Sequence, residues 1–221
     1  MPMLDFFPVV RRFAATALLF CVAPSFAGVY DEILFAADQG DTATVTALLG
    51  RGLDVNTSDR DGTTLLMMAA RTGNQQLLEI LLRNRANILK KNKYGDDALM
   101  LAAYRGDLEN VKKLVAAGAD VHPAGWTPLL YAAFQGKAAV VRYLLENGAQ
   151  VDAPAPNGQT ALMLATLGNY VDVVDVLMAA GADMAIVDLQ GQSAAEVAHR
   201  AGNNRLADHI AGAAKARAVA N

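Results

Sequence analysis

Short apolar runs alternate with polar, glycine-containing stretches along most of this chain. Each of four such runs is followed, after a glycine or asparagine, by a second apolar-patterned stretch, as at residues 108–120 and 171–183. The first runs are LLMMAA at 65–70, LMLAA at 99–103, LLYAA at 129–133 and LMLAT at 162–166. Apolar runs bounded in this way predict short α-helices that come in pairs.

Residues that can cap a helix precede the first helix of each pair. Their side-chain oxygens can accept hydrogen bonds from the exposed amides that open a helix. Pro128 follows one of them, at a first helical position where the missing N–H costs nothing. The predicted caps are Thr64, Asp97, Thr127, Thr160 and Ser193.

Three series of turn residues show that the pairs repeat. The first series ends the first helices at intervals of 33, 33, 30, 33 and 33 residues: Gly40, Gly73, Gly106, Gly136, Asn169 and Gly202. The second is Gly62, Gly95, Gly125, Gly158 and Gly191, and the third is Gly52, Arg85, Gly118, Gly148 and Gly181. All three shorten once, at the same place, so the chain is a tandem array. We expect a left-handed backbone at the helix-ending turns, which costs a non-glycine residue such as Arg85 roughly 1–2 kcal/mol.

Small and large apolar residues recur at fixed places in each unit. Alanine pairs such as Ala102–Ala103 lie where neighbouring helices must approach closely, and leucines such as Leu114 fill the space between units. One helix pair cannot bury such a face alone, so stability must come from stacking of neighbouring units.

Two stretches carry a family resemblance: GWTPLLYAAFQGKAAVVRYLLENGAQVD and GQTALMLATLGNYVDVVDVLMAAGADM. They resemble ankyrin repeats, which implies an all-α solenoid of about six stacked helix–loop–helix units with polar terminal caps. The family's histidine is replaced by Met67, Met100, Leu130 and Met163. We expect the array to span residues 28–212, with a frayed helical tail over 213–221. The expected units are 29–59, 60–92, 93–122, 123–155, 156–188 and 189–212.

The N-terminal residues 1–27 have the order of a secretory signal. Arg11 and Arg12 precede an apolar run of eleven, residues 13–23, and a small-x-small site ends at Ala27. A bilayer span needs about 20 apolar residues, so this run is too short for one. The general and the twin-arginine export routes both stay open. We expect cleavage after Ala27 and a periplasmic location, with no membrane span left in the mature chain.

Composition narrows the classes of function. The full chain is 53% hydrophobic and has a formal net charge of −3, which favours a folded, acidic protein. Acidic chains are poor candidates for nucleic acid binding, since cationic side chains supply most of that affinity. Cys21 is the only cysteine and lies in the predicted signal, so the mature chain would have no disulfide and no thiol chemistry.

Residues of the types that usually act in catalysis are few, and most of them already have a structural role in the repeat. Ser58 and Ser193 lie outside nucleophile motifs, and His122, His199 and His209 lack metal-ligand spacing. Aspartates recur at equivalent turn positions, where such side chains stabilise turns: Asp54, Asp120, Asp152 and Asp183. We therefore expect no enzyme, no metal and no cofactor.

The third and fourth units carry an unusual group of aromatic side chains. The resemblance implies a binding face made of first helices and loop tips, and tyrosine, tryptophan and arginine dominate interface hot spots. The spacer from Gly118 to Gly125 is 7 residues, against 10 elsewhere, so we expect a notch beside Trp126. The alternative is that Trp126 only covers apolar surface that the shorter loop leaves bare. The candidate contact residues are Tyr94, Tyr104, Arg105, Trp126, Tyr131, Phe134 and Gln135.

A second candidate surface is basic. It is a docking patch for an acidic partner or an ordinary solvated surface, as most charge runs are. Its residues are Arg83, Arg85, Lys90, Lys91 and Lys93.

These features favour a monomeric, non-enzymatic periplasmic adaptor that binds another protein. Small exported proteins that it resembles support periplasmic enzymes such as catalase, or act as immunity or inhibitor proteins against a delivered toxin. An alternative from another class is a carrier of a flat aromatic ligand such as haem. Such a ligand would stack on Tyr104, Trp126 and Phe134, with Met100 and His122 in the same units.

Overall fold

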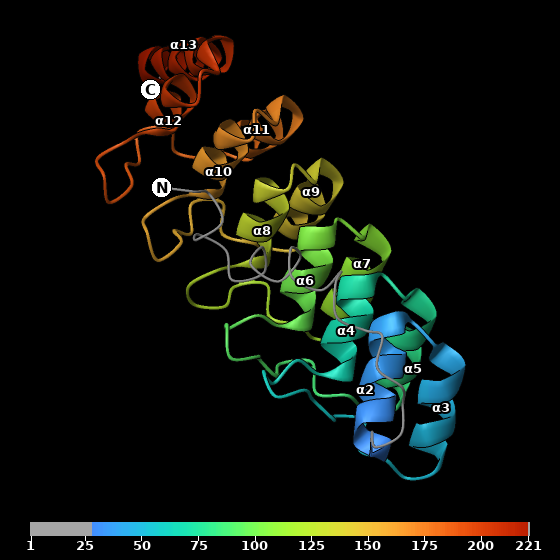
Figure 1. Ribbon diagram of the computed structural model, residues 1–221. Coiled ribbons are helices and arrows are strands. Elements are labelled where there is room, and N and C mark those ends of the chain that lie inside the picture. The colour runs from blue at the N-terminus through green and yellow to red at the C-terminus, as the bar shows by residue number, and fades with distance from the viewer. Residues whose placement is uncertain (1–27, 221) are drawn as a thin grey trace.

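The computed structural model describes residues 28–220, which form twelve α-helices joined by turns and loops (Figure 1). The predicted signal, residues 1–27, lies outside the described residues. In chain order the helices are α2 (Val29–Gln39), α3 (Thr42–Gly50), α4 (Leu65–Thr72), α5 (Gln75–Arg83), α6 (Ala98–Arg105), α7 (Leu108–Ala116), α8 (Pro128–Phe134), α9 (Ala138–Glu146), α10 (Ala161–Leu167), α11 (Val171–Ala179), α12 (Ala194–Arg200) and α13 (Asn204–Ala220).

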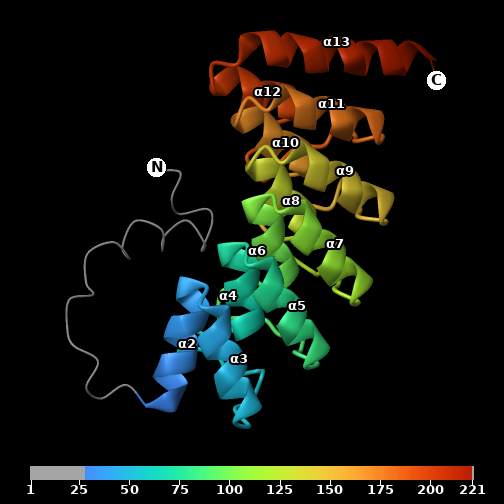
Figure 2. The same cartoon turned by 90° about the vertical axis from the view of Figure 1, so that its right-hand side faces the viewer.

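The helices form consecutive pairs that stack side by side. The first helices of the pairs, α2, α4, α6, α8, α10 and α12, make one row, and the second helices make another (Figure 2). Each first helix packs against its own partner and against the first helices of the neighbouring units. The loops between pairs project to one side of the stack (Figure 1). The all-α array of stacked helix pairs that the sequence predicts is confirmed.

All five predicted cap residues accept the hydrogen bond assigned to them. Thr64 also belongs to a reciprocal capping box, in which its own amide donates to the Sδ of Met67 at 3.4 Å. These bonds fix the start of each first helix at a local sequence signal. The donor–acceptor distances are 3.2 Å for Met67 N to Thr64, 2.9 Å for Met100 N to Asp97, 3.2 Å for Leu130 N to Thr127, 3.5 Å for Met163 N to Thr160 and 3.4 Å for Glu196 N to Ser193.

Two non-glycine residues adopt the left-handed backbone that the repeat requires. Asn169 has φ 56° and Arg85 has φ 60°, as their positions in the glycine series predict. Asparagine tolerates this region better than most residues, whereas arginine has no such preference. Arg85 is therefore a point of local backbone strain.

One continuous core runs through the stack. It includes Ala102 and Ala132, both fully buried, which let adjacent first helices approach closely. The methionines at the family's histidine position, Met67, Met100 and Met163, are each only 1% exposed. The core therefore fills with flexible thioethers where other arrays of this pattern place imidazole.

The sequence predicts a frayed helical tail over residues 213–221. Helix α13 continues to Ala220 without interruption. The Arg217 guanidinium donates to the carbonyl oxygens of Ala182, at 3.0 Å, and Met178, at 2.9 Å. These acceptors lie at the end of α11, so the two bonds dock the last turns of α13 onto the preceding unit.

Candidate functional site

Two aromatic side chains, one from the third unit and one from the fourth, pack against Tyr131 of α8. The Tyr131 ring lies edge-on to Tyr104 of α6, with the ring centroids 6.1 Å apart and an interplanar angle of 74°. Trp126, just before α8, packs against the same ring at 5.9 Å and 55°. Edge-to-face and tilted pairs at such distances are favourable beyond their buried area.

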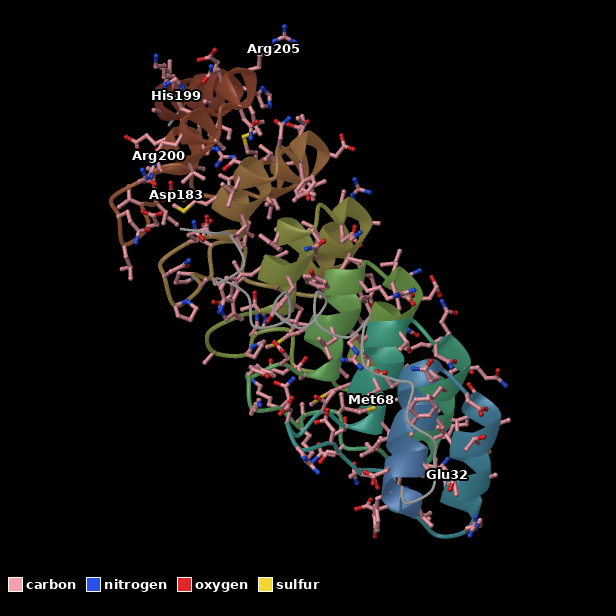
Figure 3. The ribbon with its side chains drawn as sticks, viewed as in Figure 1. Glu32, Met68, Asp183, His199, Arg200 and Arg205 are labelled. Carbon is pink, nitrogen blue, oxygen red and sulfur yellow. The ribbon has the colours of Figure 1, made fainter. Side chains whose placement is uncertain are left out.

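Tyr131 itself is not a surface residue, which corrects its prediction as a contact residue. Its side chain is 0% exposed, and its hydroxyl donates to Oδ1 of Asp96 at 2.5 Å. The reason is a property of the repeat, because neighbouring units cover this position of the first helix throughout the stack. The equivalents Met68, Leu101, Leu164 and Val197 are exposed by 5% or less, and only Phe35 of the first unit, at 56%, is open. Figure 3 labels Met68 on α4.

The other candidate contact residues keep some exposure. Tyr104, Trp126 and Phe134 are half-buried and pack against the core. We call these three side chains the aromatic surface. Arg105 is exposed, and Gln135 is half-buried at the end of α8.

Arg105 and Tyr94 lie beside the aromatic surface in the third unit, and each has structural contacts of its own. The Arg105 guanidinium donates to the carbonyl of Arg71 at 3.4 Å and lies over Gly73. Tyr94 is exposed on the loop, and the Lys93 ammonium lies 5.0 Å from its ring centroid. The ring of Tyr131 contacts the rings of both Tyr104 and Trp126, so these two candidate residues from adjacent units share one buried neighbour.

Two buried carboxyl groups lie beneath this cluster. The sequence pattern predicts Asp96 on the exposed binding face and Asp97 as a helix cap, and it does not single out the pair for its ionisation. Asp96 is 2% exposed and Asp97 is 5% exposed. Burial raises the pKa of Asp96, although the hydrogen bonds from Tyr131 and Asn92 act in the opposite direction. Burial also raises the pKa of Asp97 to about 6, against the cap bond from Met100 and the charge of Lys91. A signal was available, because the other units hold neutral Thr63–Thr64, Trp126–Thr127 and Gln159–Thr160 at this place.

The shortened loop does leave a hollow, although not the one expected. A pocket of about 210 Å³ lies between the third and fourth loops. The indole of Trp126 does not line it and instead contacts Tyr131. This pocket therefore does not open onto the indole, which turns toward the helices and keeps part of its surface exposed. The lining residues are Val121, His122, Pro123, Ala124, Gly125, Thr127, Leu129, Ala149, Gln150, Ala153 and Pro154.

The candidate basic patch is partly neutralised within the chain. Lys93 Nζ lies 2.5 Å from Oδ1 of Asp61, and Arg83 lies 3.1 Å from Glu79. Glu79 also pairs with Lys113 at 2.6 Å, and the hydrogen bond from Lys113 is the largest cause of its lowered pKa. The Nζ of Lys90 donates to the Asn56 carbonyl at 3.5 Å, whereas Arg85 and Lys91 are exposed. Three of the five predicted cations, Arg83, Lys90 and Lys93, therefore already have partners within the chain, which makes this surface weaker evidence of a docking site than the aromatic surface.

Met100 and His122, the residues named for the alternative of a haem carrier, are not positioned together as axial ligands. Met100 is 1% exposed within the core, and His122 lies exposed on the short loop. His199 lies near the end of α12, as Figure 3 shows, and His209 pairs with Asp175 at 2.9 Å. In the part of the chain that the structure describes, no three His, Cys, Asp or Glu side chains cluster in a way that could hold a metal ion.

Turn aspartates account for the recurring acidic positions. Asp54 accepts from the amide of Asn56 at 2.8 Å, and Asp120 accepts from the amide of His122 at 2.8 Å. Asp183 accepts from the amide of Ala185 at 2.8 Å, and Asp152 bridges units by accepting from the amide of Asp183 at 3.0 Å. The predicted turn role is confirmed for Asp54, Asp120 and Asp183, whereas Asp152 joins two units.

A family model for ankyrin repeats, in three copies, matches residues 33–124 and again 99–188. Together the two matches cover well over half of the chain. The chain belongs to the ankyrin repeat family. The array is therefore a protein-binding scaffold of a kind that is typically non-catalytic. Between residues 28 and 220, none of the helices combines the length and apolar character that crossing a bilayer requires.

Several ankyrin proteins are similar to this chain. The putative ankyrin repeat protein YahD of Escherichia coli is 28% identical over 193 residues, covering 68% of this chain and 96% of the relative. A transient receptor potential cation channel subfamily A member 1 homolog of Caenorhabditis elegans is 33% identical over 141 residues, or 62% of this chain. The ankyrin repeat and KH domain-containing protein mask-1 of the same organism is 32% identical over 157 residues, or 69% of this chain. This chain spans only 12% and 6% of those two long proteins, respectively.

Proposed function

We propose that this ankyrin array is a non-enzymatic adaptor of the periplasm that binds another protein through the aromatic surface. The observation that carries the proposal is the half-buried group of Tyr104, Trp126 and Phe134 from two adjacent units. Tyr104 and Trp126 rest on fully buried Tyr131, and Phe134 packs against the core. A partner that covers these rings would bury large apolar area at little cost in side-chain entropy, because the core already holds them.

The aromatic surface is local to the third and fourth units. At the position of Tyr104 and Phe134, the second and fifth units carry Arg71 and Leu167. At the position of Trp126, the second and fifth units carry Thr63 and Gln159. A framework that needed aromatic packing at these positions would use it in every unit, so the local enrichment favours recognition.

The compartment and the kind of partner rest on residues 1–27, whose order is that of an export signal. An enzyme of the same compartment, such as a catalase, is the partner class we favour, and a toxin delivered to that compartment is the competing class. The two are distinguished by the identity of the bound protein and by whether binding raises or abolishes its activity.

Affinity capture of the mature chain from its own cell envelope tests the proposal. We expect one dominant protein in the eluate of the unmodified chain, and its loss with the double variant Trp126→Ala, Phe134→Ala. The matched control is Tyr143→Ala, which removes a half-buried aromatic side chain from second helix α9 and should leave capture unchanged. Equal capture by all three forms would refute binding through the aromatic surface.

A further inference from the structure

We propose that Asp96 and Asp97 make the aromatic surface responsive to pH, so that proton uptake by this pair on mild acidification stabilises the folded array and alters the contacts between the third and fourth units. This inference rests on the proposed function in one respect: the proposed function assigns partner binding to the aromatic surface. The junction itself can be tested without any partner.

The pair is unusual in its placement. Two adjacent carboxyl groups, 2% and 5% exposed, lie at the N-terminus of α6. Among residues 28–220, neither Asp96 nor Asp97 forms a salt bridge. The equivalent caps in the neighbouring units are the neutral Thr64, Thr127 and Thr160. A buried carboxylate with no cation bound to it is costly, and a second one beside it adds repulsion.

The pair is connected directly to the aromatic surface. Asp96 accepts from the Tyr131 hydroxyl at 2.5 Å, and the Tyr131 ring touches both Tyr104 and Trp126. Asp97 accepts from the amide of Met100 at 2.9 Å and so fixes the start of α6, the helix that carries Tyr104. The charge state of the pair therefore acts on groups from both units of the junction.

Few other charges bear on the pair. Lys91 of the preceding loop favours the ionised form of Asp97, and the charge of Asp96 disfavours it. Tyr131 of α8 stays protonated, since burial and the carboxylate of Asp96 both raise its pKa, and burial likewise raises the pKa of Tyr104. Within the described chain, the charged side chains of the adjacent helices α4 and α7 are not among the groups that shift either carboxyl: Arg71, Glu109, Lys112 and Lys113.

The sign of the effect follows from proton linkage. The folded pKa of Asp97, about 6, lies above its ordinary value of 3.8. The folded state therefore binds more protons than the unfolded state between these values, so stability rises as the pH falls. From pH 7.5 to pH 5, this one group should lower the unfolding equilibrium constant about tenfold.

Urea unfolding of the mature chain at pH 5.0, 6.0 and 7.5, followed by Trp126 fluorescence and far-ultraviolet circular dichroism, tests the proposal. On going from pH 5.0 to 7.5, the unfolding equilibrium constant should rise about tenfold more in the unmodified chain than in Asp97→Thr. Asp97→Thr keeps the cap type of the neighbouring units, and Asp97→Asn serves as a second neutral variant. Parallel pH dependence in the unmodified chain and both variants would overturn the proposal.

A second readout addresses the aromatic surface rather than overall stability. In the folded chain without urea, the emission of Trp126 should titrate with a midpoint near pH 6. That titration should weaken in Asp97→Thr and also in Tyr131→Phe, which cuts the bond to Asp96 while keeping the ring. The exposed cap variant Asp41→Asn is the control and should leave the titration unchanged. Emission that is flat from pH 5 to 7.5 in the unmodified chain would show that the pair does not act on the surface, whatever the outcome of partner capture.

Discussion

Replacing Arg85 by glycine should stabilise the array. Arg85 holds φ 60° at the end of α5, where the equivalent residues Gly52, Gly118, Gly148 and Gly181 have φ of 90–95°. Arginine can reach only the narrow left-handed region. Its side chain is exposed, so the substitution removes no core packing.

The expected gain follows from two opposing terms. Relief of the left-handed strain contributes about 1–2 kcal/mol, and the greater freedom of glycine in the unfolded chain opposes it by about 0.5–1 kcal/mol. The net stabilisation is about 0.5–1 kcal/mol. With a urea dependence of about 2 kcal/mol per molar, the unfolding midpoint should rise by about 0.3–0.5 M.

The reverse substitution, Gly118→Arg, is the matched control. A Cβ added at Gly118 would meet no atom within 4 Å, so its effect isolates the backbone term. We expect its unfolding midpoint to fall by at least as much as that of Arg85→Gly rises. Urea unfolding followed by circular dichroism measures both. An unchanged midpoint in both variants would refute the assignment of strain to this turn.

Two further substitutions test contacts between neighbouring units. Gly73→Ala should cost about 1–2 kcal/mol in thermal unfolding, because Gly73 has φ 76° and an added Cβ would overlap the Arg105 guanidinium; an unaltered melting temperature would contradict this. Arg217→Ala should cost about 1–2 kcal/mol and speed amide exchange over residues 213–220, because it removes the bonds to Ala182 and Met178. Unaltered exchange there would mean that those bonds do not hold the helix.

Most of the fold could be predicted from local sequence signals. The caps, the helix-ending turns and even the left-handed Arg85 and Asn169 follow from residue type and a fixed period, since each depends on a few neighbouring residues. The docking of the C-terminal tail was not predicted, because it depends on Arg217 reaching carbonyl oxygens of the preceding unit.

The candidate site was predicted only in outline, because exposure depends on what the neighbouring units cover. The period placed Tyr131 on the face of the first helices, but the stack buries it completely. The indole of Trp126 turns toward Tyr131 rather than into the hollow of the short loop. The sequence pattern predicts Asp96 on the exposed face and Asp97 as a cap, and the raised pKa of each follows only from its burial.

Site-specific photo-crosslinking in intact cells tests the central claim most directly. A photoreactive phenylalanine analogue would replace Phe134, on first helix α8, in one variant, and Tyr143, on second helix α9, in another. Both native side chains are half-buried aromatic residues of the same unit. We predict a covalent adduct with one partner protein at position 134 and none at 143. Adducts of equal yield at both positions, or an adduct at 143 alone, would contradict binding through the aromatic surface.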